Sequence, residues 1–247
     1  MELRVLGGCG AWPTAGQACS GYLLEHDGFR LLIDPGYAVL PRLLRHMDAA
    51  EVDAVLVSHG HPDHCADLNP LLRARSLRDD PAPALPVFSL PAALDAVLAL
   101  DRPGLLAGAI DLRPFEAGES LAIGPLVLTT RALPHSVPNA GVRLTAGGRS
   151  LAYTGDAAPD PALVDLARDA GVLLAEASFI DAVPGEDRPT LSSARDAGRQ
   201  ATEAGVGALV LTHLLPGTDR RRSAAAARAE FGGSVRVARP GLTMSVG

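Results

Sequence analysis

The chain has 247 residues, of which 47% are hydrophobic, and it carries a formal net charge of −6. This composition excludes an intrinsically disordered chain, because such chains have too few apolar residues to build a core. No apolar run reaches the ~18 residues that a membrane-spanning helix needs, and the acidic balance argues against a protein whose main task is to grip nucleic acid.

The first half of the chain predicts mainly short strands. Apolar segments punctuated by glycine, proline and aspartate are predicted as strands at 3–6, 21–24, 29–33 and 52–57. Apolar side chains recur at helical spacing over 37–47, which predicts a helix there. Shorter helices are expected at 70–78 and 91–100, with a proline-rich loop at 79–86 between them.

The second half predicts more strands and then an alternation of strands and helices. Strands are expected at 110–113, 126–132, 142–145, 150–154, 172–175, 208–212, 235–238 and 242–246. Helices are expected at 160–170, 192–204 and 223–231. This order predicts an α/β fold class, a four-layer αββα sandwich of two mixed sheets with helices on the outer faces. No linker or repeat divides the chain, so one domain over residues 1–247 is expected.

One short segment concentrates the chemistry of the chain. It follows the predicted strand at 52–57 and reads His59-Gly60-His61-Pro62-Asp63-His64. Packing does not explain it, because burying so many polar groups without partners costs free energy. Imidazole and carboxylate are ligands that Zn²⁺ takes at about 2.0–2.2 Å. The segment therefore predicts a site for two divalent metal ions, with zinc favoured and manganese or iron as alternatives that accept the same donors.

Three further polar residues lie where a predicted strand has just ended. His135 follows the strand at 126–132, Asp156 follows the strand at 150–154, and His213 directly follows the strand at 208–212. The carboxyl ends of strands are where α/β proteins gather their sites. Together with the histidine-rich segment, these residues predict a set of seven metal ligands.

This set resembles the signature of the metallo-β-lactamase superfamily, which is H-x-H-x-D-H followed by a later His, an Asp and a final His. Within the superfamily, the chain is most similar to the branch of RNase Z and the cyclic-nucleotide phosphodiesterases. The segments behind the resemblance to this branch are Ser20-Gly21-Tyr22-Leu23, Tyr153-Thr154-Gly155-Asp156, Ala175-Glu176-Ala177-Ser178-Phe179 and the spacing to Leu211-Thr212-His213. The segment Leu32-Ile33-Asp34-Pro35-Gly36 fits the superfamily as a whole.

The resemblance implies a role for each of these residues. One metal would be held by His59, His61 and His135, the other by Asp63, His64 and His213, and Asp156 would bridge both. Two metals lower the pKa of a shared water so that hydroxide is available at neutral pH, and Asp63 is expected to orient this nucleophile or accept its proton. Asp34 is interpreted as a residue behind the ligands or as a turn residue.

Leaving-group protonation is where the chain departs from the family pattern. In similar phosphodiesterases a histidine at the start of a late helix, supported by a glutamate, supplies this proton. Glu176 matches the glutamate and is predicted as a catalytic residue, but Leu191 stands where the histidine is expected. Either the leaving group is good, or a water or Ser192 replaces the histidine, or the substrate belongs to another class.

The expected partner is a small-molecule substrate rather than a nucleic acid or a membrane. RNase Z enzymes carry a long arm that contacts tRNA, and the stretch between His135 and Asp156 is too short to hold one. A small phosphodiester such as a cyclic nucleotide fits better. The resemblance also allows a homodimer. No secretory signal is recognised at the amino terminus, so a cytoplasmic location is expected.

Other reactions remain open, because one metal site can serve several chemistries. The first alternative is hydrolysis of a lactone, a thioester or another carboxylic ester, which needs no strong general acid. A mononuclear iron oxygenase on the same scaffold is a less favoured alternative, and metal content would distinguish it. A metal-binding protein without turnover is the least favoured.

Overall fold

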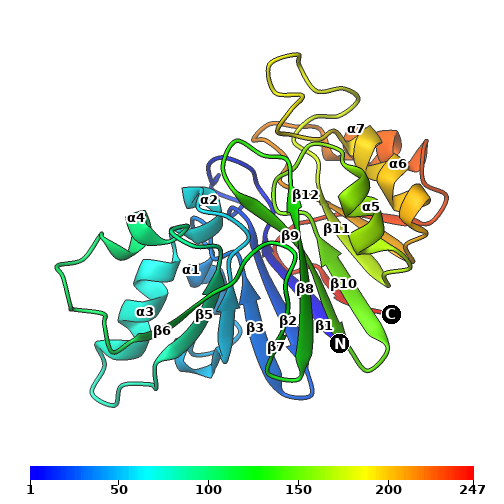
Figure 1. Ribbon diagram of the computed structural model, residues 1–247. Helices are drawn as coiled ribbons and strands as arrows, with labels where there is room; N and C mark the ends of the chain where they lie inside the picture. Colours follow the sequence, from blue (N-terminus) through cyan, green and yellow to red (C-terminus); the bar gives the residue numbers. More distant parts are fainter.

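The computed structural model describes all residues, 1–247, and shows two seven-stranded sheets packed face to face (Figure 1). The first sheet has the order β14-β1-β2-β3-β4-β5-β6. Its strands are β1 (Glu2–Gly7), β2 (Gly21–His26), β3 (Phe29–Ile33), β4 (Ala54–Leu56), β5 (Leu85–Ser89), β6 (Ile110–Pro114) and β14 (Thr243–Ser245). Pairing is antiparallel from β14 to β3 and parallel from β3 to β6, so the sheet is mixed.

The second sheet has the order β13-β12-β11-β10-β9-β8-β7 and is also mixed. Its strands are β7 (Ser120–Ile123), β8 (Leu126–Leu133), β9 (Asn139–Ala146), β10 (Arg149–Tyr153), β11 (Val172–Glu176), β12 (Ala208–Thr212) and β13 (Ser234–Val237). The predicted αββα sandwich is thereby confirmed.

Helices cover the outer face of each sheet (Figure 1). Those beside the first sheet are α1 (Leu40–Leu43), the 3-10 helix η1 (Ala49–Glu51), α2 (Pro62–Cys65), α3 (Leu68–Ser76) and α4 (Asp95–Leu98). Those beside the second sheet are α5 (Pro161–Ala167), α6 (Ala194–Ala204) and α7 (Arg220–Arg228). None of these helices has the length and apolar character needed to cross a membrane.

Three apolar clusters hold the layers together. One lies between the two sheets and includes the fully buried Tyr22 and Tyr153. A second lies between the second sheet and α5–α7, and a third between the first sheet and its helices. Successive side chains of a strand point alternately to the inner face, which packs against the other sheet, and to the outer face, which packs against helices. Both faces of each sheet are buried in this way.

Several predicted boundaries were wrong, each for a local reason. The helix expected over 37–47 is α-helical only at Leu40–Leu43, because Ala38 adopts a left-handed conformation (φ 64°) before it and the chain continues as turns after it. The helix expected at 91–100 is reduced to Asp95–Leu98. Strand β5 was missed because its Pro86 is typical of a loop. Strand β4 pairs only with Val87 and Phe88 of β5, which follow the proline, so Pro86 does not interrupt the β4–β5 ladder.

Candidate metal centre

The histidine-rich segment leaves strand β4 and turns into the short helix α2. His61 is the N-cap residue and Pro62 occupies the first turn, a position where its missing N–H is not needed and its fixed φ suits a helix. Asp63 and His64 therefore project from the first turn of a helix, whereas His59 and His61 project from the loop before it. This change of backbone conformation directs neighbouring side chains to two different points.

The other three predicted ligands reach the same place from the second sheet. His135 follows β8, Asp156 follows β10 and His213 follows β12, each within a few residues of the strand's end. Because these strand ends face the end of β4 across the sandwich, all seven residues come together. They form two groups that share Asp156.

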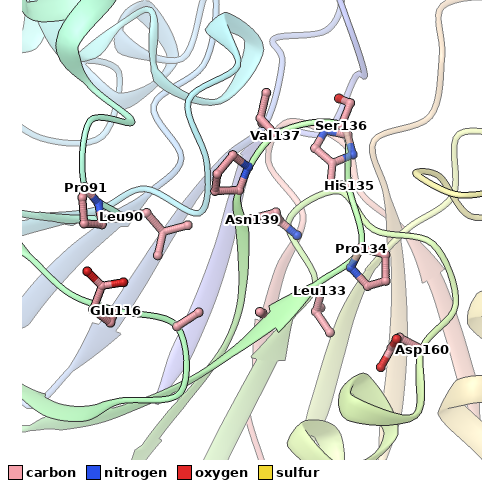
Figure 2. A pocket seen from close by; sticks show the side chains of 13 residues that line it. Leu90, Pro91, Glu116, Leu133, Pro134, His135, Ser136, Val137, Asn139 and Asp160 are labelled. Carbon is pink, nitrogen blue, oxygen red and sulfur yellow. The ribbon is translucent and has the colours of Figure 1, made fainter.

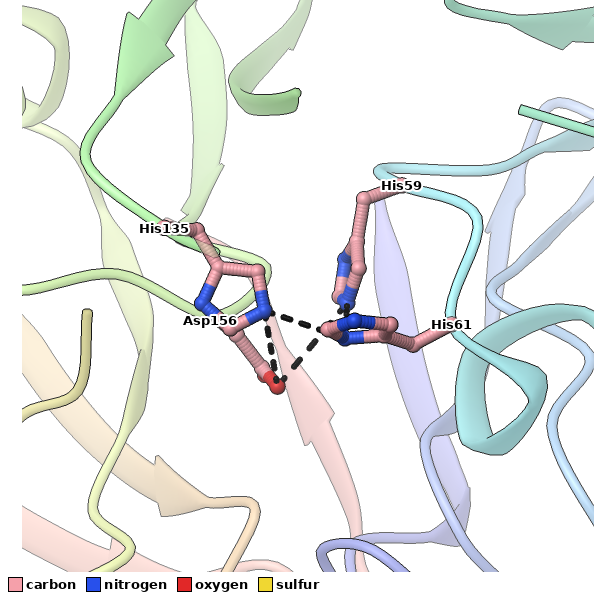
Figure 3. Close-up of side chains that lie close together, drawn as sticks. All are labelled: His59, His61, His135 and Asp156. Carbon is pink, nitrogen blue, oxygen red and sulfur yellow. Dashed lines mark hydrogen bonds and ion pairs between the residues drawn. The ribbon is translucent and has the colours of Figure 1, made fainter. Parts of the chain in front are cut away.

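The first group contains His59, His61, His135 and Asp156 (Figure 3). Nδ1 of His61 lies 3.1 Å from Nε2 of His59 and 3.1 Å from Nε2 of His135. Oδ2 of Asp156 lies 3.9 Å and 4.0 Å from those two Nε2 atoms. A tetrahedral Zn²⁺ site with bonds of about 2.0–2.1 Å has ligand atoms about 3.3 Å apart, so this spacing fits a cation at the centre.

The second group contains Asp63, His64, Asp156 and His213, and all four are buried. Nε2 of His213 lies 3.1 Å from Oδ2 of Asp63 and 3.0 Å from Oδ2 of Asp156. Nε2 of His64 lies 3.3 Å from Oδ1 of Asp156. These last two atoms are buried without a hydrogen-bond partner. Because unpaired buried polar atoms are costly, the donor set fits a divalent cation bound between them.

The outward-facing nitrogen of four site histidines is held by a hydrogen bond. His64 Nδ1 donates to Oδ2 of Asp34 over 2.7 Å, and His135 Nδ1 donates to the carbonyl oxygen of Thr190 over 2.9 Å. His59 Nδ1 lies 3.1 Å from the Ser58 hydroxyl and His213 Nδ1 lies 2.9 Å from the Ser178 hydroxyl. Such contacts select the tautomer whose Nε2 lone pair faces the metal position.

Asp34 lies directly behind the site and is fully buried. Besides His64, its carboxylate accepts hydrogen bonds from the Ser58 amide (2.7 Å), the Ser58 hydroxyl (2.6 Å) and the Tyr153 hydroxyl (2.6 Å). It thus joins the end of β3 to the metal-binding segment and to the second sheet. The interpretation of Asp34 as a residue behind the ligands agrees with these contacts.

The surroundings shift the pKa values of several candidate ligands in ways that bear on cation binding. Burial would raise the pKa of Asp63, but the His213 hydrogen bond and the nearby imidazoles hold it well below its usual range. Burial lowers the pKa of His59, which keeps this imidazole neutral as metal binding requires. Burial opposes protonation of His64, yet the carboxylates of Asp156 and Asp34 raise its pKa, and a bound cation would take the place of that proton.

The two residues invoked for leaving-group protonation, Glu176 and Ser192, are both buried. Glu176 is 1% exposed, and without metal its burial together with the Asp156 charge raises its pKa to about 8. Cations bound beside Asp156 would lower this pKa and keep the carboxylate ionised. The Ser192 hydroxyl is buried and donates to the carbonyl oxygen of Ala157 over 2.6 Å. Leu191 lines a separate cavity of about 400 Å³ with Arg188. Ser192 is therefore already engaged within the protein.

The sequence reasoning missed most residues that orient the ligands. No role was predicted for Ser58, Ser178 or Tyr153, although the last two lie in segments that carry the family resemblance. The Ala11 amide, which donates to Oδ2 of Asp63 over 2.7 Å, was not predicted either. Ser58 could have been suspected because it directly precedes His59. The Ala11 and Thr190 backbone contacts have no sequence signal, since any residue type supplies the same amide or carbonyl.

The chain is similar in sequence to known proteins. The family model described as the beta-lactamase superfamily domain matches residues 29–214. The probable metallo-hydrolase YhfI of Bacillus subtilis is 32% identical over 245 residues, covering 98% of this chain and 98% of that protein. The ribonuclease Z of Kineococcus radiotolerans is 32% identical over 290 positions, covering 96% of this chain and 91% of that protein.

Solved structures agree with the fold. The crystal structure of YhfI from Bacillus subtilis superposes with a TM-score of 0.90 at 30% identity, over 99% of each chain. The short form of human tRNase Z superposes with a TM-score of 0.79 at 20% identity over 100% of each chain, which shows a shared fold.

Proposed function

This chain belongs to the metallo-β-lactamase superfamily, and from that premise we propose that it is a metal-dependent hydrolase, and more narrowly a phosphodiesterase acting on a small phosphodiester such as a cyclic nucleotide. The observation that carries the proposal is Asp156, which is shared by two groups of four candidate ligands. The relative named ribonuclease Z supports phosphodiester chemistry. Zinc is the favoured metal, with manganese and iron as alternatives.

Two bound cations would make hydroxide available at neutral pH and stabilise charge on the phosphoryl oxygens. The protein's own contribution is orientation. The Ala11 amide holds Oδ2 of Asp63 in place at 2.7 Å, and the depressed pKa keeps that carboxylate ionised. Asp63 is therefore proposed to bind metal and to orient the attacking oxygen. Tautomers fixed by Asp34, Ser58, Ser178 and Thr190 present the imidazoles without rearrangement.

An open pocket of about 860 Å³ lies beside His135 (Figure 2). Its walls are largely apolar and include Leu90, Pro91, Leu133, Pro134, Val137 and Pro138. The only carboxylates in its lining are those of Glu116 and Asp160, which lie on opposite sides of it in Figure 2. These two carboxylates repel additional phosphate groups. The pocket thus supports a substrate whose non-reacting part is uncharged, rather than a nucleic acid.

Changing the charge of this pocket is expected to change selectivity. Glu116→Arg changes the charge by two units and should raise kcat/KM for a trinucleotide relative to 3′,5′-cyclic AMP by about 30-fold, because each unit of charge at about 4 Å is worth about 1 kcal/mol in water. Glu116→Gln is the matched control with half the charge change and should give a smaller rise. Both effects should shrink in high salt. An unchanged ratio in both variants would place the substrate elsewhere.

The decisive test of the proposed function is turnover by purified protein loaded with zinc or manganese. Bis(p-nitrophenyl) phosphate and 3′,5′-cyclic AMP are the substrates, and Asp63→Ala is the control. Turnover that is lost in the variant is the expected result. The activated aryl ester should react faster, because no histidine is available to protonate a poor leaving group. Five of the seven histidines are candidate metal ligands, and the other two, His26 and His46, lie outside both groups.

One observation favours a second candidate, hydrolysis of a lactone, a thioester or another carboxylic ester. The position of the expected proton donor is taken by Leu191, and the Ser192 hydroxyl is engaged with Ala157. Acyl substrates depend less on such a donor. Absence of phosphodiester turnover by protein shown to hold two metals per chain would overturn the phosphodiesterase proposal and direct the assays to these esters.

A further inference from the structure

Glu176 ends strand β11 and uses its whole carboxylate inside the protein. Oε2 accepts a hydrogen bond from the Ala157 amide over 2.6 Å. Oε1 accepts from the Ser192 amide over 3.1 Å and from the Ser178 hydroxyl over 2.8 Å. A carboxylate that is 1% exposed and receives three donors has no free oxygen directed at a substrate. Its contacts point instead to the segments that carry the metal ligands.

The Ser178 contact leads directly to a candidate ligand. A hydroxyl has one hydrogen, and Ser178 donates it to Glu176, so its oxygen is free to accept from His213 Nδ1 at 2.9 Å. The proton on His213 is thereby kept on Nδ1. Its Nε2 lone pair then faces Oδ2 of Asp63 at 3.1 Å and Oδ2 of Asp156 at 3.0 Å, where the second cation would bind.

The backbone around these residues also needs support. His213 has a left-handed conformation with φ of 56°, which non-glycine residues adopt only where the surroundings hold them. The amide of Ala177, next to Ser178, supports this backbone by donating to the carbonyl oxygen of Thr212 over 2.8 Å. The Ala157 amide that Glu176 holds belongs to the residue directly after Asp156. One carboxylate therefore fixes both His213 and the turn that carries the shared aspartate.

We infer that Glu176 and Ser178 are positioning residues that build the second metal position, Glu176 acting through Ser178 on His213 and through Ala157 on Asp156. This inference rests on the proposed metal centre but not on the substrate. The first group has the same device, since Oδ2 of Asp34 accepts from the Ser58 hydroxyl, which faces His59 Nδ1. The hydrogen-bond chain from Glu176 through Ser178 to His213 gives Glu176 a positioning role that does not depend on a histidine at position 191.

The test measures metal binding in Ser178→Ala, Ser178→Thr and Glu176→Gln. Loss of an orienting contact behind a ligand lowers metal affinity by about 10–100-fold. We expect Ser178→Ala to fall from two metals per chain to one during equilibrium dialysis against limiting zinc, with elemental analysis as the readout. Ser178→Thr keeps a hydroxyl and should retain the second metal. Glu176→Gln should lose it, because its amide nitrogen cannot accept from the donors that now surround the carboxylate.

Ser223→Ala is the matched control, since Ser223 is a fully buried serine in α7 outside both groups. It should bind two metals with wild-type affinity. The inference is overturned if Ser178→Ala binds two metals as tightly as the wild type, or if Ser223→Ala loses metal equally. It is also overturned if Glu176→Gln keeps both metals while kcat falls, which would assign Glu176 to the chemistry. Because binding is measured without substrate, failure of the phosphodiesterase assay leaves this test intact.

Discussion

Asp156→Asn is expected to lower kcat/KM for bis(p-nitrophenyl) phosphate by at least about 10³-fold. The metals supply several kcal/mol of transition-state stabilisation, and each 1.36 kcal/mol is a factor of ten. Asp156 is 2% exposed and has a carboxylate oxygen within 4.0 Å of Nε2 of four histidines. An amide has one acceptor oxygen and no charge, so it cannot bridge two cations. Steady-state kinetics with elemental analysis on the same sample measures both losses.

Asp219→Asn is the matched control for that variant. Asp219 caps helix α7 by accepting from the amides of Arg221 and Arg222, and asparagine caps helices equally well. This variant should keep two metals and wild-type turnover. If Asp156→Asn retained both metals and more than about a tenth of the activity, the bridging role of Asp156 would be wrong.

Asp34→Ala is expected to cause the largest loss of stability of any single change near the site, about 4 kcal/mol or more. The substitution removes the acceptor for four buried donors on Ser58, His64 and Tyr153, and each buried group left unpaired costs about 1–3 kcal/mol. Folded domains are stable by only about 5–15 kcal/mol. The melting temperature should fall by about 10 °C or more, at about 2–4 °C per kcal/mol for a chain of this size.

The measurement compares thermal unfolding of both proteins in chelator, which separates the broken hydrogen bonds from the loss of metal. Asp34→Asn provides a graded comparison, because its one amide oxygen can still accept from some of the donors. It should be less destabilised than Asp34→Ala. A shift of under about 3 °C for Asp34→Ala without metal would show that solvent or rearrangement satisfies these donors, contrary to the network described above.

Local sequence carried the prediction of the fold class and of the ligand set. Strands are recognisable in the sequence as short apolar runs between turn residues. The polar residues from His59 to His64 are so close in sequence that they form a cluster whatever the fold. Helix and strand ends were less predictable. Ala38 has no sequence feature that announces a left-handed conformation, and Pro86 is acceptable in β5 only because of what pairs with the strand.

Gly36 illustrates a residue type whose reason is visible only in three dimensions. A Cβ added there would lie 1.8 Å from the backbone carbonyl oxygen of Asp63, so only glycine lets the β3–α1 connection pass α2 this closely. In the sequence, Gly36 was one letter in a segment that resembled the family. The structure explains it as a spacer that allows Asp63 to reach its place.

By itself, the sequence determined that this protein is an α/β sandwich with a histidine- and aspartate-rich site at the ends of its strands, because apolar periodicity and residue type are local properties. The family resemblance already divided the candidate ligands into two groups, and only the tertiary structure decided how their side chains are oriented. Tyr153, Thr190 and Ser178 meet Asp34, His135 and His213 across long stretches of chain. The Tyr153 contact depends on how the two sheets pack, and the other two depend on how the strands and loops of the second sheet are arranged. No motif predicts these hydrogen bonds, which orient the rings of His135 and His213 and hold the carboxylate behind His64.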